Sequence, residues 1–223
     1  MKYSVILADP AWHEVTYSHK GQGRSAAAHY DAMSIDAITA LPVADYAARD
    51  GWLFLWTTWP MLRQAMGVID AWAFTYSSNA FVWIKTKKDG SPRMNCGHTT
   101  RKCTELCLLA KRGKGVLRKS ASVRDVILAP QREPHRKPDE QYGMIEALYD
   151  GPYLELFARY RRPGWDVALS DQIETGATAR RWKSTSYPEQ SGVAEDKDAY
   201  MRRAGDQVLV GVNRPPLQLK EPQ

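Results

Sequence analysis

The sequence has few cysteines and no long apolar run. None of its stretches approaches the roughly 20 apolar residues that span a bilayer, and no secretory signal peptide opens it. Its three cysteines are an odd number without paired spacing, which is typical of a protein from a reducing compartment. We therefore expect a cytoplasmic protein that makes no contact with a membrane.

The sequence also lacks the paired ligands of a structural metal site. Cys96, His98, Cys103 and Cys107 lie close together in the chain, but they do not form the Cys-x-x-Cys pairs that hold zinc. Ordinary reduced cysteines beside a loop and a strand account for this group. We expect no bound metal.

Acidic residues are scarce in one part of the chain. Residues 85–137 contain 15 Lys or Arg and only 4 Asp or Glu, a local charge of +11 in a chain whose net charge is +6. The remaining residues therefore carry a charge of −5. Such segregation favours a surface for a polyanion such as a nucleic acid, and an ordinary solvated loop is the alternative.

The 223 residues are enough for one α/β domain with a full core. Short apolar runs that predict strands alternate with segments whose apolar positions recur at helical spacing. Ser34 is expected to cap a helix whose apolar positions are Ile35, Ile38 and Leu41. Strands are predicted over residues 3–8, 52–56, 74–84, 106–110, 126–129, 153–157 and 165–169, and further helices over 60–71 and 137–149.

Asp9-Pro10-Ala11-Trp12 directly follows the first predicted strand, at the sheet edge where open α/β folds bind ligands. The Asp9 carboxylate and the Pro10 carbonyl are two hydrogen-bond acceptors, and Trp12 offers a flat face for stacking. A flipped-out adenine needs two acceptors for its exocyclic amine and a ring that stacks on its π face. The alternative is an ordinary turn followed by a core tryptophan.

A second block of interest lies in the last third of the predicted core. Lys137-Pro138-Asp139-Glu140 is typical of a helix start, because it places a proline and two acids in the first turn. After the next predicted strand come Arg159, Arg161 and Arg162. The last strand ends in Ser170-Asp171, and an acid at such a position holds ribose hydroxyls in dinucleotide-binding folds.

Several motifs occur together in a fixed order. They are Ala8-Asp9-Pro10-Ala11-Trp12, His29-Tyr30-x-x-Met33-Ser34, Leu53-Phe54-Leu55-Trp56-Thr57, Trp83-Ile84-Lys85-Thr86, Thr104-Glu105-Leu106-Cys107-Leu108, His135-x-Lys137-Pro138-Asp139-Glu140, and Leu154-Glu155-Leu156-Phe157-Ala158-Arg159 running to Pro163-Gly164-Trp165-Asp166. Their joint order is far more specific than any one of them. Over roughly residues 2–172 the chain resembles the MT-A70 family of S-adenosylmethionine-dependent adenine N6-methyltransferases, in the compact form common in phages and prophages.

The resemblance implies an α/β fold with a Rossmann-like methyltransferase sheet, helices on both faces and a circularly permuted motif order. It also implies that Asp9 and the Pro10 carbonyl bind the adenine amine while Trp12 stacks on the base, so that catalysis rests on positioning and electrostatics. Lys137 would pair with the carboxylate of the cofactor's methionyl end. The other implied cofactor-binding residues are Asp9, Arg159, Ser170 and Asp171, and those near the target nucleotide are Tyr30, Lys85 and Glu105.

The chain departs from the family pattern in three places. The usual Asp-Pro-Pro-Trp has Ala11 in place of its second proline, and the usual Trp-Gly-Asn ending of the last strand is Ala168-Leu169-Ser170. The third departure is at the start of the sequence, which begins at the predicted strand before Asp9, whereas longer members have an upstream segment that contacts the cofactor's adenine. We expect the C-terminal tail to supply that wall, or the pocket to be open on that side.

We expect a methyltransferase domain over residues 1–172 and a partly disordered C-terminal extension over residues 173–223. The expected partner is DNA, and the expected activity is transfer of a methyl group from S-adenosylmethionine to the adenine N6 of DNA by a phage-encoded enzyme. It would act in the cytoplasm of a bacterium or an infected host cell. The alternatives are a non-catalytic nucleic-acid-binding protein that keeps the fold as a scaffold, and an RNA adenine N6-methyltransferase.

Restoring the second proline tests the departure at Ala11. Proline removes backbone freedom, an effect on the order of 0.5–1 kcal/mol, and should stiffen the turn that holds the Pro10 carbonyl. We expect Ala11→Pro to raise turnover or to tighten S-adenosylmethionine binding, measured by methyl transfer and by calorimetric titration. If neither quantity changes, the missing proline does not soften the site.

Overall fold

The computed structural model describes residues 1–13, 33–95, 97, 99–132, 136–158 and 161–170. All of them belong to the first of two units into which the chain divides, residues 1–187 and 188–223. The predicted boundary between the methyltransferase domain and its extension lies outside the described residues. Within them, no helix is long and apolar enough to cross a membrane.

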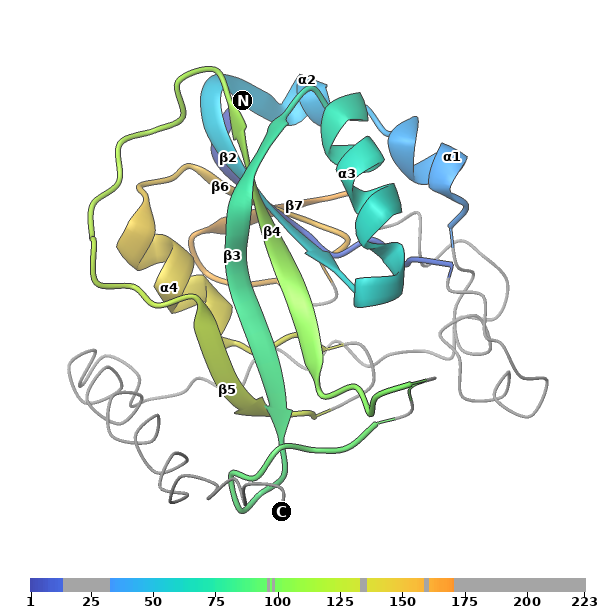
Figure 1. The fold of residues 1–223 in the computed structure, drawn as a ribbon. Coiled ribbons are helices and arrows are strands. Elements are labelled where there is room, and N and C mark those ends of the chain that lie inside the picture. The colour runs from blue at the N-terminus through green and yellow to red at the C-terminus, as the bar shows by residue number, and fades with distance from the viewer. Residues whose placement is uncertain (14–32, 96, 98, 133–135, 159–160, 171–223) are drawn as a thin grey trace, which may run out of the picture. The chain divides into compact units, whose positions relative to one another are not determined.

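The described residues contain one seven-stranded sheet with the strand order β5-β3-β4-β2-β1-β6-β7. β4 runs antiparallel to its neighbours β2 and β3, and all other neighbouring strands are parallel (Figure 1). The predicted α/β class and Rossmann-like sheet are confirmed, and the circular permutation stays a prediction. The strands are β1 (Tyr3–Ala8), β2 (Ala47–Thr57), β3 (Thr75–Thr86), β4 (Thr104–Arg112), β5 (Val126–Pro130), β6 (Tyr153–Leu156) and β7 (Trp165–Ala168).

Helices cover both faces of the sheet, as expected. Side chains alternate along β1, so Ile6 and Ala8 join one apolar core while Val5 and Leu7 join the other. The first core lies under α1, α2 and α3, the second under α4, and Figure 1 shows α3 and α4 on opposite sides of the strands. The helices are α1 (Ile35–Thr39), α2 (Val43–Tyr46), the 3-10 helix η3 (Trp59–Met61), α3 (Leu62–Ala71) and α4 (Glu140–Leu148).

The predicted elements are present, with differences at their ends. The Ser34 hydroxyl caps α1 by accepting a hydrogen bond from the Ala37 N–H at 3.1 Å, as predicted. β2 is longer than the predicted strand because its early residues also pair, Gly51 lying opposite Arg112 of β4. α4 begins at Glu140, after the predicted start, since Asp139 is its N-cap residue. The four-residue α2 was not predicted, because so short a helix has no visible periodicity.

Two residues at the ends of β6 and β7 have left-handed backbone conformations. Phe157 has a φ of 64° and Leu169 a φ of 60°. The Phe157 N–H donates to the Ala168 carbonyl at 3.2 Å, which ties the two strand ends together. Such a conformation costs a non-glycine residue about 1–2 kcal/mol. Leu169 stands where the family pattern has glycine, so this chain keeps the glycine-like backbone without the glycine.

Two substitutions at Leu169 separate backbone strain from side-chain packing. Leu169→Ala and Leu169→Gly remove nearly the same apolar contacts, but only glycine relieves the positive φ. We expect the glycine variant to be more stable than the alanine variant by about 1 kcal/mol, measured by urea unfolding. Equal stability of the two variants would show that the backbone at this position carries no strain.

Candidate active site

Four charged side chains from separate segments meet at one edge of the sheet. Asp9 directly follows β1, and Lys85 is the second-last residue of β3. Glu105 is near the start of β4, whose antiparallel direction brings that start to the edge where β1 and β3 end. Lys137 lies just before α4. The structure thus brings together four of the residues that the sequence assigned to catalysis or binding.

These four side chains form a row of alternating charges. Lys137 Nζ lies 2.8 Å from Asp9 Oδ1 and donates a hydrogen bond to Asp9 Oδ2 at 2.9 Å. The same Nζ lies 3.3 Å from Glu105 Oε2, and Lys85 Nζ donates to Glu105 Oε1. Asp9 is the most exposed member, at 27% against 12–16% for the other three. Asp9 is therefore the member of the row that solvent reaches most easily.

Pairing decides the ionisation of the buried members. Burial alone would lower the pKa of Lys137, but the neighbouring Asp9 and Glu105 carboxylates raise it above its ordinary value. Burial alone would raise the pKa of Glu105, but the ammonium groups of Lys137 and Lys85 hold it below its ordinary value. Lys137 and Glu105 are therefore both ionised at neutral pH.

Two tryptophans form the floor of the site. Lys137 Nζ lies 5.6 Å from the ring centroid of Trp56, and Lys85 Nζ lies 5.1 Å from that of Trp83, both within the range of cation–π attraction. The two rings meet edge to face. Trp56 Nε1 donates to Gln141 Oε1 at 2.6 Å, which joins this floor to α4. The sequence assigned no role to these residues, because their place beneath the lysines depends on strand pairing.

The Asp9-Pro10-Ala11-Trp12 segment forms a tight turn. The Trp12 N–H donates to the Pro10 carbonyl at 2.9 Å, which leaves that oxygen a second lone pair for a ligand. The Trp12 indole is 6% exposed, lies in the core on the α3 side, and donates from Nε1 to the Trp56 carbonyl at 2.9 Å. Trp12 therefore does not offer a free face in this conformation, because its N–H has a buried acceptor and its ring has apolar neighbours. Stacking by Trp12 stays a prediction.

The predicted cofactor residues are only partly described. Ser170 follows β7, two strands away from β1 in the sheet. In the described part of the chain, its Oγ is buried and has no hydrogen-bond partner. A buried hydroxyl without a partner costs free energy, so this atom suits a polar ligand group. Arg159, Asp171 and Tyr30 lie outside the described residues, and their roles stay predictions.

Glu155 is a titratable residue beside the site to which the sequence gave no role. It lies on β6 opposite Leu7 of β1 and accepts hydrogen bonds from the Tyr142 hydroxyl at 2.9 and 3.1 Å. Burial raises the pKa of Glu155 to about 7, against the Tyr142 hydrogen bonds and with a contribution from the Asp9 carboxylate. Only the neighbours of an acid decide such a shift, so the sequence carried no signal for it.

The cysteine group beside the site is only partly described. Cys107 is buried in the core, and burial raises the pKa of its thiol well above the ordinary value. Cys96 and His98 lie outside the described residues. Among the residues that the structure describes, no three His, Cys, Asp or Glu side chains could hold a metal ion together.

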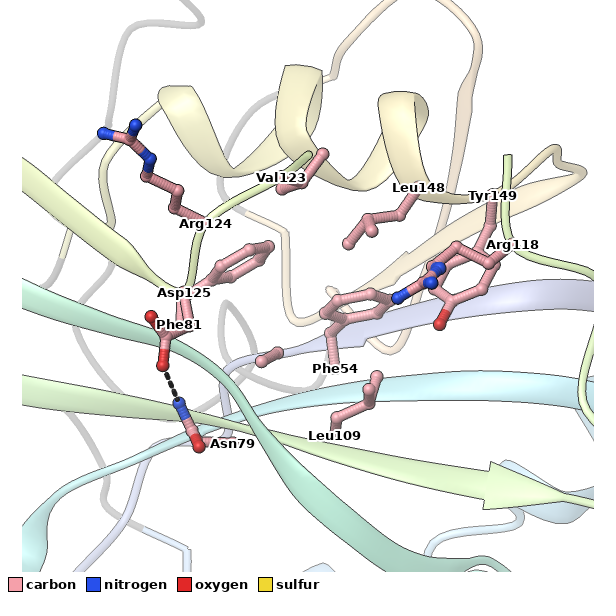
Figure 2. A pocket seen from close by; sticks show the side chains of 11 residues that line it. Phe54, Asn79, Phe81, Leu109, Arg118, Val123, Arg124, Asp125, Leu148 and Tyr149 are labelled. Atoms are coloured by element: carbon pink, nitrogen blue, oxygen red, sulfur yellow. Dashed lines mark hydrogen bonds between the residues drawn. The ribbon is translucent and has the colours of Figure 1, made fainter. Parts of the chain in front are cut away.

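A separate hollow of about 170 Å³ lies between the sheet and the end of α4 (Figure 2). Phe54, Phe81 and Leu109 come from the strands, and Leu148 and Tyr149 from the end of α4 and the residue after it. None of the residues assigned to catalysis or binding lines this hollow.

Comparison with known proteins decides the family. The MT-A70 family model matches residues 3–168, which is most of the chain. The chain belongs to the MT-A70 family. This is a family of N6-adenine methyltransferases, and the seven-stranded sheet of the described residues agrees with such a fold.

MT-A70 relatives of different lengths match the chain. It is 30% identical to the type II methyltransferase M.MunI of Mycoplasma sp over 182 residues, which cover 74% of this chain and 76% of M.MunI. It is 28% identical to the N(6)-adenosine-methyltransferase catalytic subunit METTL3 of Homo sapiens, over 78% of this chain and 28% of METTL3. An MT-A70-like N(6)-adenosine-methyltransferase of Arabidopsis thaliana is 30% identical, over 84% of this chain and 27% of that protein. The chain thus spans about a quarter of these two longer relatives.

The raised pKa of Glu155 predicts a pH-dependent stability. Between its unfolded value near 4.5 and its folded value of about 7, only the folded protein holds this proton, so stability falls as the pH rises through this window. Glu155→Gln cannot ionise and keeps an acceptor for Tyr142. Urea unfolding at pH 4.5 and pH 8 measures the effect. We expect the free energy of unfolding of Glu155→Gln, relative to that of the unsubstituted protein, to be higher at pH 8 than at pH 4.5 by on the order of 2–3 kcal/mol.

Tyr142→Phe is the matched variant, because it removes the hydroxyl that stabilises the ionised carboxylate. It should lose more stability above pH 7 than below pH 5. A difference between Glu155→Gln and the unsubstituted protein that is the same at both pH values would contradict the raised pKa.

Proposed function

We propose that this protein transfers a methyl group from S-adenosylmethionine to the N6 amine of adenine in DNA. The observation that carries the proposal is that Asp9, Lys137 and Glu105 form paired charges at one edge of the sheet of an MT-A70 protein. Asp9 directly precedes Pro10, whose carbonyl is a second acceptor. A chain that kept the fold only as a scaffold would have no need for this arrangement of buried charges, which is costly unless every member is paired.

Asp9 would orient the adenine amine. Lys137 contacts both carboxylate oxygens, and each oxygen keeps a further lone pair for an N–H donor. The lone pair of an aromatic amine is delocalised into the ring, so the nitrogen is a poor nucleophile. Acceptors at Asp9 and at the Pro10 carbonyl that draw both N–H bonds out of the ring plane favour the tetrahedral geometry of attack.

The residues present fit S-adenosylmethionine. Lys137 is a cation beside Asp9 at the sheet edge, and it would pair with the cofactor's carboxylate by sharing N–H donors that now point to its acidic partners. Ser170 Oγ, buried without a partner in the described part of the chain, would bind a ribose hydroxyl. When bound, the cofactor supplies an activated methyl group, and the protein's part is to align the amine with it.

The connection between β3 and β4 supplies charge for a nucleic acid. It leaves the same edge of the sheet and begins as a hydrogen-bonded turn, in which the Arg93 N–H donates to the Lys85 carbonyl at 2.7 Å. Lysine and arginine side chains on this connection would contact phosphates. They are Lys87, Lys88, Arg93, Arg101 and Lys102.

We propose DNA as the polymer because the chain spans 76% of M.MunI, a type II methyltransferase of comparable length, but only 28% of the N(6)-adenosine-methyltransferase subunit METTL3. RNA is the second candidate, since N(6)-adenosine-methyltransferases also match the chain over most of its length. Location in the cytoplasm of a bacterium or a phage-infected cell belongs to the same proposal.

Transfer of tritiated methyl groups from S-adenosylmethionine to unmethylated double-stranded DNA tests the proposal, with RNA in parallel. We expect incorporation into DNA and at least a roughly 100-fold loss with Asp9→Ala, because an electrostatic contact to the reacting group is removed. The matched control is Asp70→Ala, an exposed acid on α3, which should keep full activity. Incorporation into RNA alone would show that the substrate is RNA and not DNA. No incorporation into either polymer, despite measurable nucleic-acid binding, would support the scaffold alternative.

A further inference from the structure

Trp59 differs from the other tryptophans in its exposure to solvent. It is 46% exposed, whereas five of the other six tryptophans in the described part of the chain are at most 6% exposed, and the sixth, Trp52, is half-buried. None of the stacked or edge-to-face ring pairs among the described residues includes Trp59. Among the residues that the structure describes, this large apolar ring is therefore partly exposed and has no aromatic neighbour.

The Trp59 indole is hydrogen-bonded within the protein. Its Nε1 donates a hydrogen bond at 2.9 Å to Thr104 Oγ1 at the start of β4, and Pro60 follows it directly in η3. The indole N–H is thus already satisfied by the protein. The other atoms of the ring are carbons, so the exposed part of the side chain suits stacking better than hydrogen bonding.

Trp59 lies at the same edge of the sheet as the charged row. Ala8 is paired with Leu55, so Asp9 is level with Trp56, and Trp59 follows three residues later. Extended residues advance about 3.3 Å each, which places Trp59 about 10 Å beyond that level. Thr104 precedes Glu105 on β4, so their side chains leave opposite faces of the sheet. Trp59 and the charged row therefore flank the edge from its two sides.

We propose that Trp59 stacks on a nucleobase next to the target adenine. In this arrangement the target base lies against Asp9 on the α4 side of the sheet. The nucleic-acid strand then crosses the edge of the sheet, and a flanking base contacts the Trp59 ring on the α3 side. Lys102, which is exposed two residues before Thr104, would contact the intervening phosphate. This inference rests on the proposed function and adds to it that the substrate is bound as a locally unpaired strand, with a stacked base beside the reacting one.

The test is binding of the full chain to a short fluorescent single-stranded DNA with one adenine, measured by anisotropy. We expect Trp59→Ala to weaken binding roughly 5- to 100-fold, the range for loss of one base–aromatic stack, and Trp59→Phe to retain most of the affinity. The matched control is Tyr76→Ala, which removes an aromatic ring of 43% exposure at the beginning of β3, the opposite end of the sheet. Its affinity should be unchanged.

An abasic nucleotide on one or the other side of the adenine identifies the stacked base. At one of these positions it should weaken binding by the unsubstituted protein as much as Trp59→Ala does, with no further loss in the variant. Three results would each overturn the inference. The effects of the abasic nucleotide and of Trp59→Ala could be independent at both positions, Tyr76→Ala could weaken binding as much as Trp59→Ala, or the unsubstituted protein could show no measurable binding. The same series on RNA shows whether the stack depends on the sugar.

Methyl transfer, measured separately, distinguishes this inference from the proposed function. A coupled loss at Trp59 and the flanking base without any methyl transfer would keep the stacking inference and reject the activity. Methyl transfer and binding that are both unaffected by Trp59→Ala would keep the activity and reject the stacking inference.

Discussion

The pairing of Lys137 with two carboxylates is the interaction on which the site depends. Lys137 comes from the segment before α4, while Asp9 and Glu105 belong to the ends of two different strands of the sheet. Without the ammonium group, two largely buried carboxylates would be left close together, and loss of one partner of a buried ion pair costs about 3–5 kcal/mol. The same contacts that keep Asp9 in place therefore join the start of α4 to the sheet edge.

The reversed direction of β4 makes this cluster of charges accessible from one side. In a fully parallel sheet the start of a strand lies at the edge away from the ligand. Because β4 is antiparallel to β2 and β3, its start brings Glu105 level with the ends of the other strands. The floor of the site depends on the same pairing, since Trp56 and Trp83 lie on the two neighbours of β4.

Unfavourable local features gather on the β6–β7 side of the site. Phe157 and Leu169 have left-handed backbones at the ends of these strands, Ser170 Oγ is buried without a partner in the described part of the chain, and Glu155 has a raised pKa. The two backbones and the unpartnered hydroxyl cost stability, and Glu155 does so as the pH rises above its unfolded pKa. Such costs are concentrated at functional sites because the surrounding fold maintains them. Their position at the carboxyl ends of parallel strands is where such folds bind cofactors.

The sequence by itself determined the strands, the Ser34 cap and the α/β class, because these follow from local apolar periodicity and capping chemistry. Through the order of its motifs it also indicated the family and named Asp9, Lys85, Glu105 and Lys137, which are up to 128 residues apart. Only the tertiary structure decided that these side chains form one row, that Trp12 is buried while Trp59 is exposed, and that the pKa of Glu155 is raised. Burial, pairing and electrostatic environment depend on which residues are neighbours in space. The order of the strands in the sheet determines those neighbours, and local sequence patterns do not determine that order.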